Sequence, residues 1–179
     1  MASHNSHEKR TDPSPWIERF VCQITGNGTV LDLACGGGRH GRMFLSHGHR
    51  VTFLDCNITA IIDLSTSVKA ELIEADLEAD SGWPLIGRTF DAVIVTNYLW
   101  RPILPHIVNT VAPGGLLLYE TFASGNEAFG RPRNPDFLLK AGELLEAMRG
   151  QLEVLRYEHL YQEAPGPSVI QHIAAFRPR

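Results

Sequence analysis

The sequence predicts an α/β fold built on a seven-stranded, mostly parallel sheet with helices on both faces. Apolar runs of strand length alternate with segments of helical spacing along most of the chain. A glycine-rich turn at residues 36–41 follows the first apolar run, as where a parallel strand leads into a helix. Near the C-terminus a short Pro-Gly turn joins two strands, which makes them antiparallel neighbours and reverses one strand of the sheet.

The helices are predicted from apolar spacing and from glycine at their ends. Trp16, Phe20 and Ile24 recur at intervals of four residues and form one apolar face. Gly48 and Gly150 each follow a helical pattern, where glycine commonly ends a helix. Helices are expected at residues 16–24, 39–47, 58–64, 103–111 and 141–149.

The strands are predicted from short apolar runs bounded by turn residues. The run at residues 90–97 is almost continuously apolar, which is typical of a central strand buried on both faces. Segment 122–135 is rich in glycine, proline and arginine and is expected to be a loop. Strands are expected at residues 29–34, 50–54, 68–74, 90–97, 116–121, 152–159 and 169–176.

The composition indicates one ordinary domain and limits its partners. The chain has 179 residues, 44% of them hydrophobic, and a net charge of −4. That charge gives no basic face, so a nucleic-acid partner is not expected. No apolar run approaches the ~20 residues that span a bilayer, so no membrane partner is expected. Residues 1–14 are polar and expected to be disordered, and residues 15–179 are expected to form the domain.

The three cysteines give no sign of a disulfide framework or a metal site. Cys22, Cys35 and Cys56 are odd in number and lack C-x-x-C spacing. We therefore expect free thiols, a cytoplasmic location and no bound metal.

The glycine-rich turn predicts a nucleotide-type cofactor site. Residues 36–41 fit the pattern G-x-G-x-x-G of dinucleotide sites, and Asp55 ends the next strand, where an acid can bind ribose hydroxyls. Asp32, however, lies inside the strand four residues before Gly36. A carboxylate there suits a cationic sulfonium better than a pyrophosphate, because opposite charges attract.

The order of these motifs resembles that of class I S-adenosylmethionine (SAM) dependent methyltransferases across about residues 15–177. The stretches 33–39 and 51–57 are most similar to the tellurite-resistance branch, which, like the thiopurine methyltransferases, acts on small soft nucleophiles. The resemblance implies a Rossmann-like methyltransferase fold. The motifs that carry it are Asp32-x-x-Cys35-Gly36-x-Gly38, Asp55, Asp76, Phe90-Asp91 and Pro113-Gly114-Gly115.

The resemblance also implies that SAM is the cofactor and S-adenosylhomocysteine (SAH) the product. In the family, the acid at Asp32 helps to hold the amino-acid end, the glycines pass beneath the ribose, and an acid at the place of Asp76 binds the adenine amino group. Residues expected to bind the cofactor are Asp32, Ala34, Cys35, Gly36, Gly38, Arg39, Asp55, Cys56, Asp76, Leu77 and Asn97. His40 is expected to pack near the cofactor carboxylate.

The acceptor is expected beyond residues 90–97, at the carboxyl edge of the sheet. Tyr98 and Arg101 follow directly, and His159 is the candidate general base. Arg101, Arg131 and Arg133 form either a cationic mouth for an anionic acceptor or a set of solvated or acid-paired side chains. Segment 97–102 lacks the Asp/Asn-Pro-Pro-aromatic motif of amino-methylating nucleic-acid enzymes, so methylation of a flipped base is not expected.

The sequence thus predicts a SAM-dependent methyltransferase acting on a small-molecule nucleophile. A soft or anionic acceptor, such as a thiol, selenium or tellurium species, fits because in-line methyl transfer to a soft atom does not require a base. Two alternatives stay open: a non-catalytic SAM-binding module and an NAD-linked oxidoreductase. The protein is expected to be a monomer or homodimer.

Overall fold

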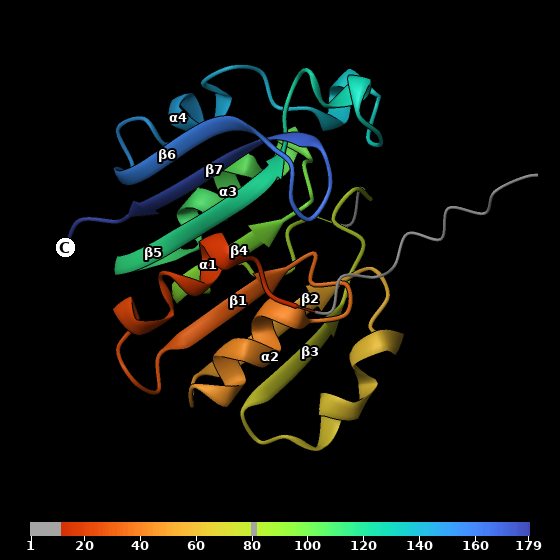
Figure 1. Ribbon diagram of the computed structural model, residues 1–179. Helices are drawn as coiled ribbons and strands as arrows, with labels where there is room; N and C mark the ends of the chain where they lie inside the picture. Colours follow the sequence, from red (N-terminus) through yellow and green to blue (C-terminus); the bar gives the residue numbers. More distant parts are fainter. Residues whose placement is uncertain (1–11, 80–81) are drawn as a thin grey trace, which may run out of the picture.

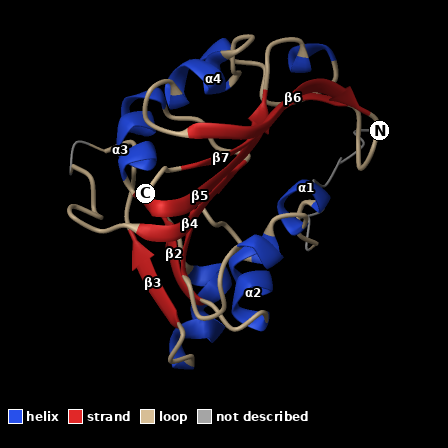
Figure 2. Ribbon diagram, turned by 90° about the vertical axis from the view of Figure 1, so that its left-hand side faces the viewer, coloured by secondary structure: helices blue, strands red, loops and turns tan. Residues whose placement is uncertain are grey.

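The computed structural model describes residues 12–79 and 82–179, which form one seven-stranded sheet between two helical layers (Figures 1 and 2). The strand order is β3-β2-β1-β4-β5-β7-β6. Strands β1 to β5 are parallel, and β7 is antiparallel to both β5 and β6, which confirms the predicted sheet. The strands are β1 (Thr29–Leu33), β2 (Arg50–Asp55), β3 (Ala70–Glu74), β4 (Phe90–Thr96), β5 (Val111–Phe122), β6 (Glu153–Gln162) and β7 (Ser168–Phe176).

The direction of strand addition reverses between β1 and β4. From β1 the chain moves outward to β2 and β3, then returns to place β4 on the other side of β1. Open α/β sheets bind ligands outside the carboxyl ends of the strands at such a switch point. The glycine-rich turn leaves β1 at this place.

The helices divide between the two faces of the sheet, as Figure 2 shows. On one face Phe44 of α2 and Ile61 of η2 pack with Phe53 of the sheet, and on the other Ile107 of α3 and Leu144 of α4 pack in a second core. The α-helices are α1 (Pro15–Glu18), α2 (Arg39–Ser46), α3 (Leu104–Asn109) and α4 (Glu143–Met148). The 3₁₀ turns are η1 (Val21–Gln23), η2 (Thr59–Thr66), η3 (Arg101–Ile103), η4 (Asn126–Ala128) and η5 (Pro135–Phe137).

Several predicted elements differ in their boundaries. The helix expected at 16–24 is broken into α1 and η1, although Trp16, Phe20 and Ile24 are all buried as their spacing predicts. The segment at 58–64 is likewise a 3₁₀ helix. Both segments contain aromatic or β-branched residues of modest helix propensity, so packing against the sheet decides their local form. The expected Pro-Gly-Gly turn at 112–115 lies within β5, where the pairing with β4 is irregular.

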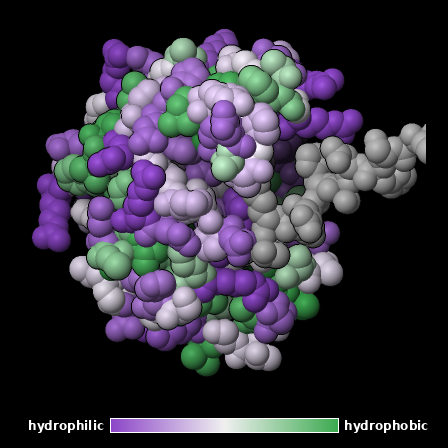
Figure 3. Space-filling model, in the orientation of Figure 1, coloured by the Kyte–Doolittle hydropathy of each residue, from purple (hydrophilic) through white to green (hydrophobic). Residues whose placement is uncertain are grey.

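Of the N-terminal segment predicted to be disordered, residues 1–11 lie outside the described residues. Residues 12–14 are described, and Ser14 is buried against the sheet and α2. On the face seen in Figure 3, hydrophilic and hydrophobic residues are interspersed. Across 12–79 and 82–179, no helix has the length and apolar character that a bilayer crossing requires.

Candidate cofactor and acceptor site

The glycines of the turn after β1 fulfil two different requirements. A Cβ at Gly36 or Gly37 would meet no described atom within 4 Å, so the backbone here is open to a ligand. A Cβ at Gly38 would lie 2.9 Å from Cγ2 of Ile61, and one at Gly41 would lie 2.1 Å from Cε1 of Phe53. The first pair thus leaves space above the turn, and the second pair lets α2 pack closely on β2 and η2.

Asp55 joins the end of β2 to this turn. Its Oδ2 accepts the backbone N–H of Gly36 at 2.8 Å, and its Oδ1 accepts that of Asn57 at 3.1 Å. An ionised carboxylate offers about four acceptor positions, so Asp55 retains capacity for ribose hydroxyls. The residues present therefore fit an adenosine-type ligand lying across the turn.

Asp32 is buried and faces α2. Its Oδ2 accepts the backbone N–H of Gly41 at 2.7 Å. Burial raises the pKa of Asp32 to about 7, while the Gly41 hydrogen bond and the Arg39 charge act in the opposite direction. One carboxylate oxygen is therefore committed to holding the first turn of α2 against β1.

Two non-glycine residues at the carboxyl edge adopt left-handed backbone conformations. Ala34 follows β1 with φ of 52°, and Asn97 follows the neighbouring β4 with φ of 54°. Such conformations are costly for residues with a Cβ and cluster at functional sites. They coincide here with the edge at which Gly36 and Asp55 meet.

The remaining cofactor candidates lie along the same edge. Asp76 is exposed after β3, with its Oδ1 accepting the N–H of Glu78 at 2.9 Å. Leu77 packs against the core. The Cys56 thiol lies 3.5 Å from Oδ1 of Asp55. Cys35 is buried, and this burial raises the pKa of its thiol, which keeps it protonated.

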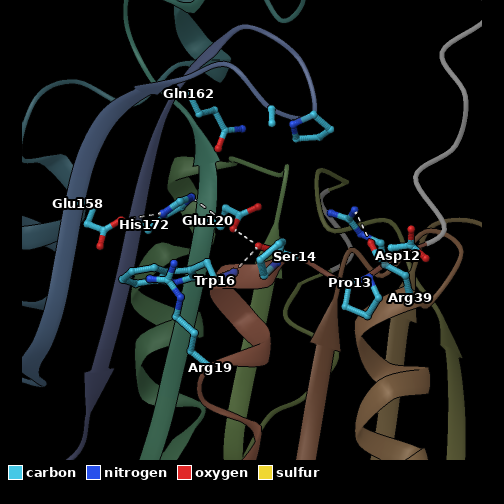
Figure 4. Close-up of a pocket in the computed structure, with 13 residues that line it drawn as sticks. Asp12, Pro13, Ser14, Trp16, Arg19, Arg39, Glu120, Glu158, Gln162 and His172 are labelled. Carbon is cyan, nitrogen blue, oxygen red and sulfur yellow. Dashed lines mark hydrogen bonds and ion pairs between the residues drawn. The ribbon is translucent and has the colours of Figure 1, made fainter.

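A pocket of about 780 Å³ opens beside this edge (Figure 4). One wall is the segment from Asp12 to Trp16, and the facing wall is formed by β5, β7 and β6. Arg39, the first residue of α2 and the first after the glycines at 36–38, also lines the pocket. The pocket volume lies within the range of about 300–1,000 Å³ that is typical of small-molecule sites.

A row of three polar side chains crosses the sheet at the pocket. Strand pairing places Glu120 of β5, His172 of β7 and Glu158 of β6 opposite one another. The Nε2 atom of His172 lies 3.3 Å from Oε2 of Glu120, and its Nδ1 lies 3.6 Å from Oε2 of Glu158. Trp16 stacks on the imidazole with ring centroids 4.7 Å apart. We call these three residues the acid–histidine row.

Ser14 links the acid–histidine row to the carboxyl edge. Its hydroxyl donates to Glu120, and its backbone N–H donates to Nε2 of His40 at 3.0 Å. The Nδ1 atom of His40 lies 3.3 Å from Oγ1 of Thr96, the last residue of β4. A continuous polar chain thus runs from the end of β4 to the pocket, and His40 serves as a structural bridge.

The structure places Tyr98 away from this pocket. Its hydroxyl is buried and has no hydrogen-bond partner among the described residues. Burial raises the pKa of Tyr98, and the nearby carboxylates of Glu78 and Asp76 add to this effect. Tyr98 therefore lies on the Asp76 side of the edge.

The expected cationic mouth does not form around Arg101. Its guanidinium binds Glu143 at 2.6 Å and donates to the backbone carbonyls of Asp136 and Leu138. Arg101 thereby fixes the segment before α4. Of the two alternatives given for Arg101, the side chain paired with an acid is the one that the structure shows. Arg131 and Arg133 are exposed and do not line the pocket.

His159 is not at the pocket. It is exposed on β6 and pairs with Gln171, one position from the Glu158–His172 pair. Successive side chains of a strand point to opposite faces, so His159 faces the side of Tyr157, whose hydroxyl accepts the Gly142 N–H near α4. The histidine that lines the pocket is His172. Polar residues within the apolar runs of β5 and β7 were the available signal for Glu120 and His172.

No group of three or more potential metal ligands occurs within residues 12–79 and 82–179.

Comparison with known proteins finds a family model that matches the first half of the sheet. Residues 30–115 match the family model described as "Methyltransferase domain". This segment of the chain is therefore similar to methyltransferase domains. The matched segment extends from β1 into β5 and includes the glycine-rich turn, Asp55 and Asp76. It favours the methyltransferase prediction over the NAD-linked alternative. A search of curated proteins finds no match.

Solved structures of methyltransferases share the fold of this chain. TehB from Haemophilus influenzae superposes with a TM-score of 0.72 at 21% identity, over 91% of this chain and 61% of that chain. A 1,6-didemethyltoxoflavin-N1-methyltransferase from Burkholderia thailandensis, solved with its substrate and SAH, gives 0.69 at 17% identity, over 92% and 77%. N-methyltransferase NodS from Bradyrhizobium japonicum gives 0.66 at 16% identity, over 94% and 99%. The present chain thus spans about three fifths of the length of TehB.

Proposed function

We propose that this protein transfers a methyl group from SAM to a small-molecule nucleophile held in the pocket beside the carboxyl edge. The observation that carries the proposal is the continuity of the two sites. Arg39 lines the pocket and also begins the helix that follows the glycine-rich turn. A cofactor on the turn and an acceptor in the pocket would therefore be neighbours, as methyl transfer requires.

The cofactor would lie along the edge from Asp76 to Asn97. Asp76 is suited to the adenine amino group and Asp55 to the ribose hydroxyls, with the open backbone of Gly36 and Gly37 beneath them. When bound, SAM supplies a methyl group that its sulfonium already activates. The chain has to align the acceptor with that methyl group and exclude water from the pocket.

The acceptor is proposed to be a small molecule, with thiol, selenium and tellurium species as the first candidates. The resemblance to the tellurite-resistance branch supports this choice, and TehB shares the fold. An anionic acceptor has less support, because Arg101 is held by Glu143 and the pocket contains Glu120 and Glu158. A reducing, cytoplasmic location is also proposed, supported by three free cysteines.

The decisive experiment is calorimetric titration of the protein with SAM and SAH. We expect micromolar binding that Asp55→Ala weakens at least tenfold, because a hydrogen bond to a charged group contributes about 1.5–3 kcal/mol. Glu146→Ala is the matched control, since it removes an exposed carboxylate from α4. Absence of binding to the folded protein would overturn the proposal. If the protein binds SAM but forms no SAH with any acceptor tested, a non-catalytic SAM-binding module would be favoured.

A further inference from the structure

The pocket contains a histidine with no assigned role. His172 is 7% exposed, and neither ring nitrogen makes an aligned hydrogen bond to any described residue, although carboxylate oxygens lie 3.3 and 3.6 Å away. A buried polar group without a hydrogen-bond partner lowers the stability of the fold, so such a group needs an explanation. A bound ligand or a transferred proton would provide His172 with the missing partner. Figure 4 shows the imidazole between Glu120 and Glu158 on the pocket wall.

We propose that His172 accepts the proton of the methyl acceptor. The acceptor is then a molecule whose nucleophilic atom carries a proton, such as an amine, a heterocyclic N–H or a thiol. Among the selenium and tellurium candidates, selenols and tellurols belong to this class. The oxyanions selenite and tellurite fall outside it, because their central atoms attack through a lone pair with no proton to lose. The inference rests on the proposed methyl transfer and specifies the chemistry of its acceptor.

The groups around His172 suit this role. Glu120 faces it from β5, Glu158 from β6, and Arg19 from the end of α1 beyond the Trp16 ring, while Arg39 and Asp12 lie elsewhere on the pocket wall. Burial lowers the pKa of His172, and the two carboxylates oppose this effect. The imidazole is therefore neutral near pH 7, and the carboxylates stabilise the imidazolium once it forms.

Glu120 is less suited to be the base itself. Its Oε2 atom accepts the hydroxyl of Ser14 and so already has a donor. Glu158 is the more accessible carboxylate, with 31% of its side chain exposed, and provides a route for the proton from Nδ1 towards solvent.

The step balances without a further reactant. The lone pair of the acceptor nitrogen or sulfur forms a bond to the methyl carbon, and the carbon–sulfur bond breaks. Its electron pair leaves with the sulfur, which gives neutral SAH. The proton leaves the acceptor atom for His172, which becomes imidazolium and then releases the proton to water.

The test compares His172→Gln with His159→Gln, which changes the exposed histidine on the other face of β6. The acceptor probes are phenethylamine, 2-mercaptoethanol, sodium selenite and sodium tellurite, with SAH release as the readout. For an amine or thiol, we expect His172→Gln to lower kcat by about 10²–10⁴-fold with little change in SAH affinity. His159→Gln should leave kcat unchanged.

Two further readouts separate proton transfer from a structural role. The wild-type rate should fall as pH decreases through a pKa below 6.5, and His172→Gln should lose this acid limb. Added imidazole should restore part of the activity of His172→Ala. Unchanged kcat and acid limb in His172→Gln would overturn the inference, as would transfer to selenite or tellurite alone.

A binding-only measurement keeps the inference testable if no probe is methylated. In the SAH complex, the His172 ring resonances should titrate below pH 6.5. Titration above pH 7 would contradict the proposal, because an imidazolium cannot accept a proton. Failure of the proposed function would give a different result: the wild-type protein would bind neither SAM nor SAH.

Discussion

The backbone N–H of Ser14 donates to Nε2 of His40 over 3.0 Å, which ties the segment before α1 to the first turn of α2. Because Nε2 accepts this hydrogen bond, the imidazole must be neutral with its proton on Nδ1. Burial lowers the pKa of His40 to about 3, and the Arg39 charge adds to the effect. The neutral bridge therefore persists across the physiological pH range.

This bridge predicts a loss of stability in acid. The unfolded chain binds a proton at His40 below about pH 6.5, whereas the folded chain binds it only near pH 3. The free energy of unfolding should therefore decrease as pH falls through this window, by up to about 1.4 kcal/mol per pH unit. His40→Gln should remove this contribution in urea unfolding at pH 7 and pH 4.5. An unchanged pH slope would contradict the prediction.

Asp32 predicts the opposite dependence. Burial raises the pKa of its folded-state carboxyl to about 7, from an ordinary value of 3.8, so between these pH values the folded chain holds a proton that the unfolded chain releases. This contribution is complete below about pH 3.8 and disappears as pH rises through 7. Asp32→Asn should therefore make acid destabilisation steeper than in the wild type, as His40→Gln makes it shallower. Equal slopes for both variants would refute the assignment.

The two roles of the glycines predict different phenotypes for similar substitutions. Gly41→Ala would place a methyl group 2.1 Å from Phe53 and should destabilise the fold by about 1–3 kcal/mol. Gly37→Ala meets no described atom within 4 Å, so thermal stability should remain near that of the wild type while SAH affinity falls. Thermal melts and calorimetry distinguish the two. Normal SAH binding by Gly37→Ala would place the cofactor elsewhere.

Arg101 should contribute to stability and not to cofactor binding. Arg101→Ala removes the Glu143 ion pair and the hydrogen bonds to the carbonyls of Asp136 and Leu138, which should cost about 1–3 kcal/mol. Arg131→Ala, at an exposed position, should change the free energy of unfolding by less than about 0.5 kcal/mol. A drop in SAH affinity without loss of stability in Arg101→Ala would restore Arg101 as a site residue.

The fold could be predicted because its signals are local and repeated. The glycine turn, the acid ending β2 and the apolar run of β4 each specify a strand end, and all occur in the order of one known fold. The 3₁₀ form of η2 could not be predicted, because the core that Ile61 shares with Phe44 and Phe53 is formed by residues distant in sequence.

The acceptor side was harder to predict because it depends on register. His159 was expected to end a strand, but β6 continues to Gln162 and leaves His159 on the face away from the pocket. A shift of one position in a strand reverses the face of every side chain. The sequence pattern alone does not fix which histidine faces the pocket, whereas the pairing of Glu158 with His172 does.

In the acid–histidine row, the residues that determine the chemistry of the pocket lie on the opposite face of the sheet from a second set that packs in the core. The side chains of the row come from three strands, and the adjacent residues Tyr119, Ile173 and Tyr157 pack in the opposite core. Substitutions in the row therefore change the chemistry of the pocket while the contacts of the opposite core stay in place. Related proteins with the same three strands could therefore differ in the acceptor they methylate, through substitutions in β5, β6 or β7, while they keep the same cofactor edge.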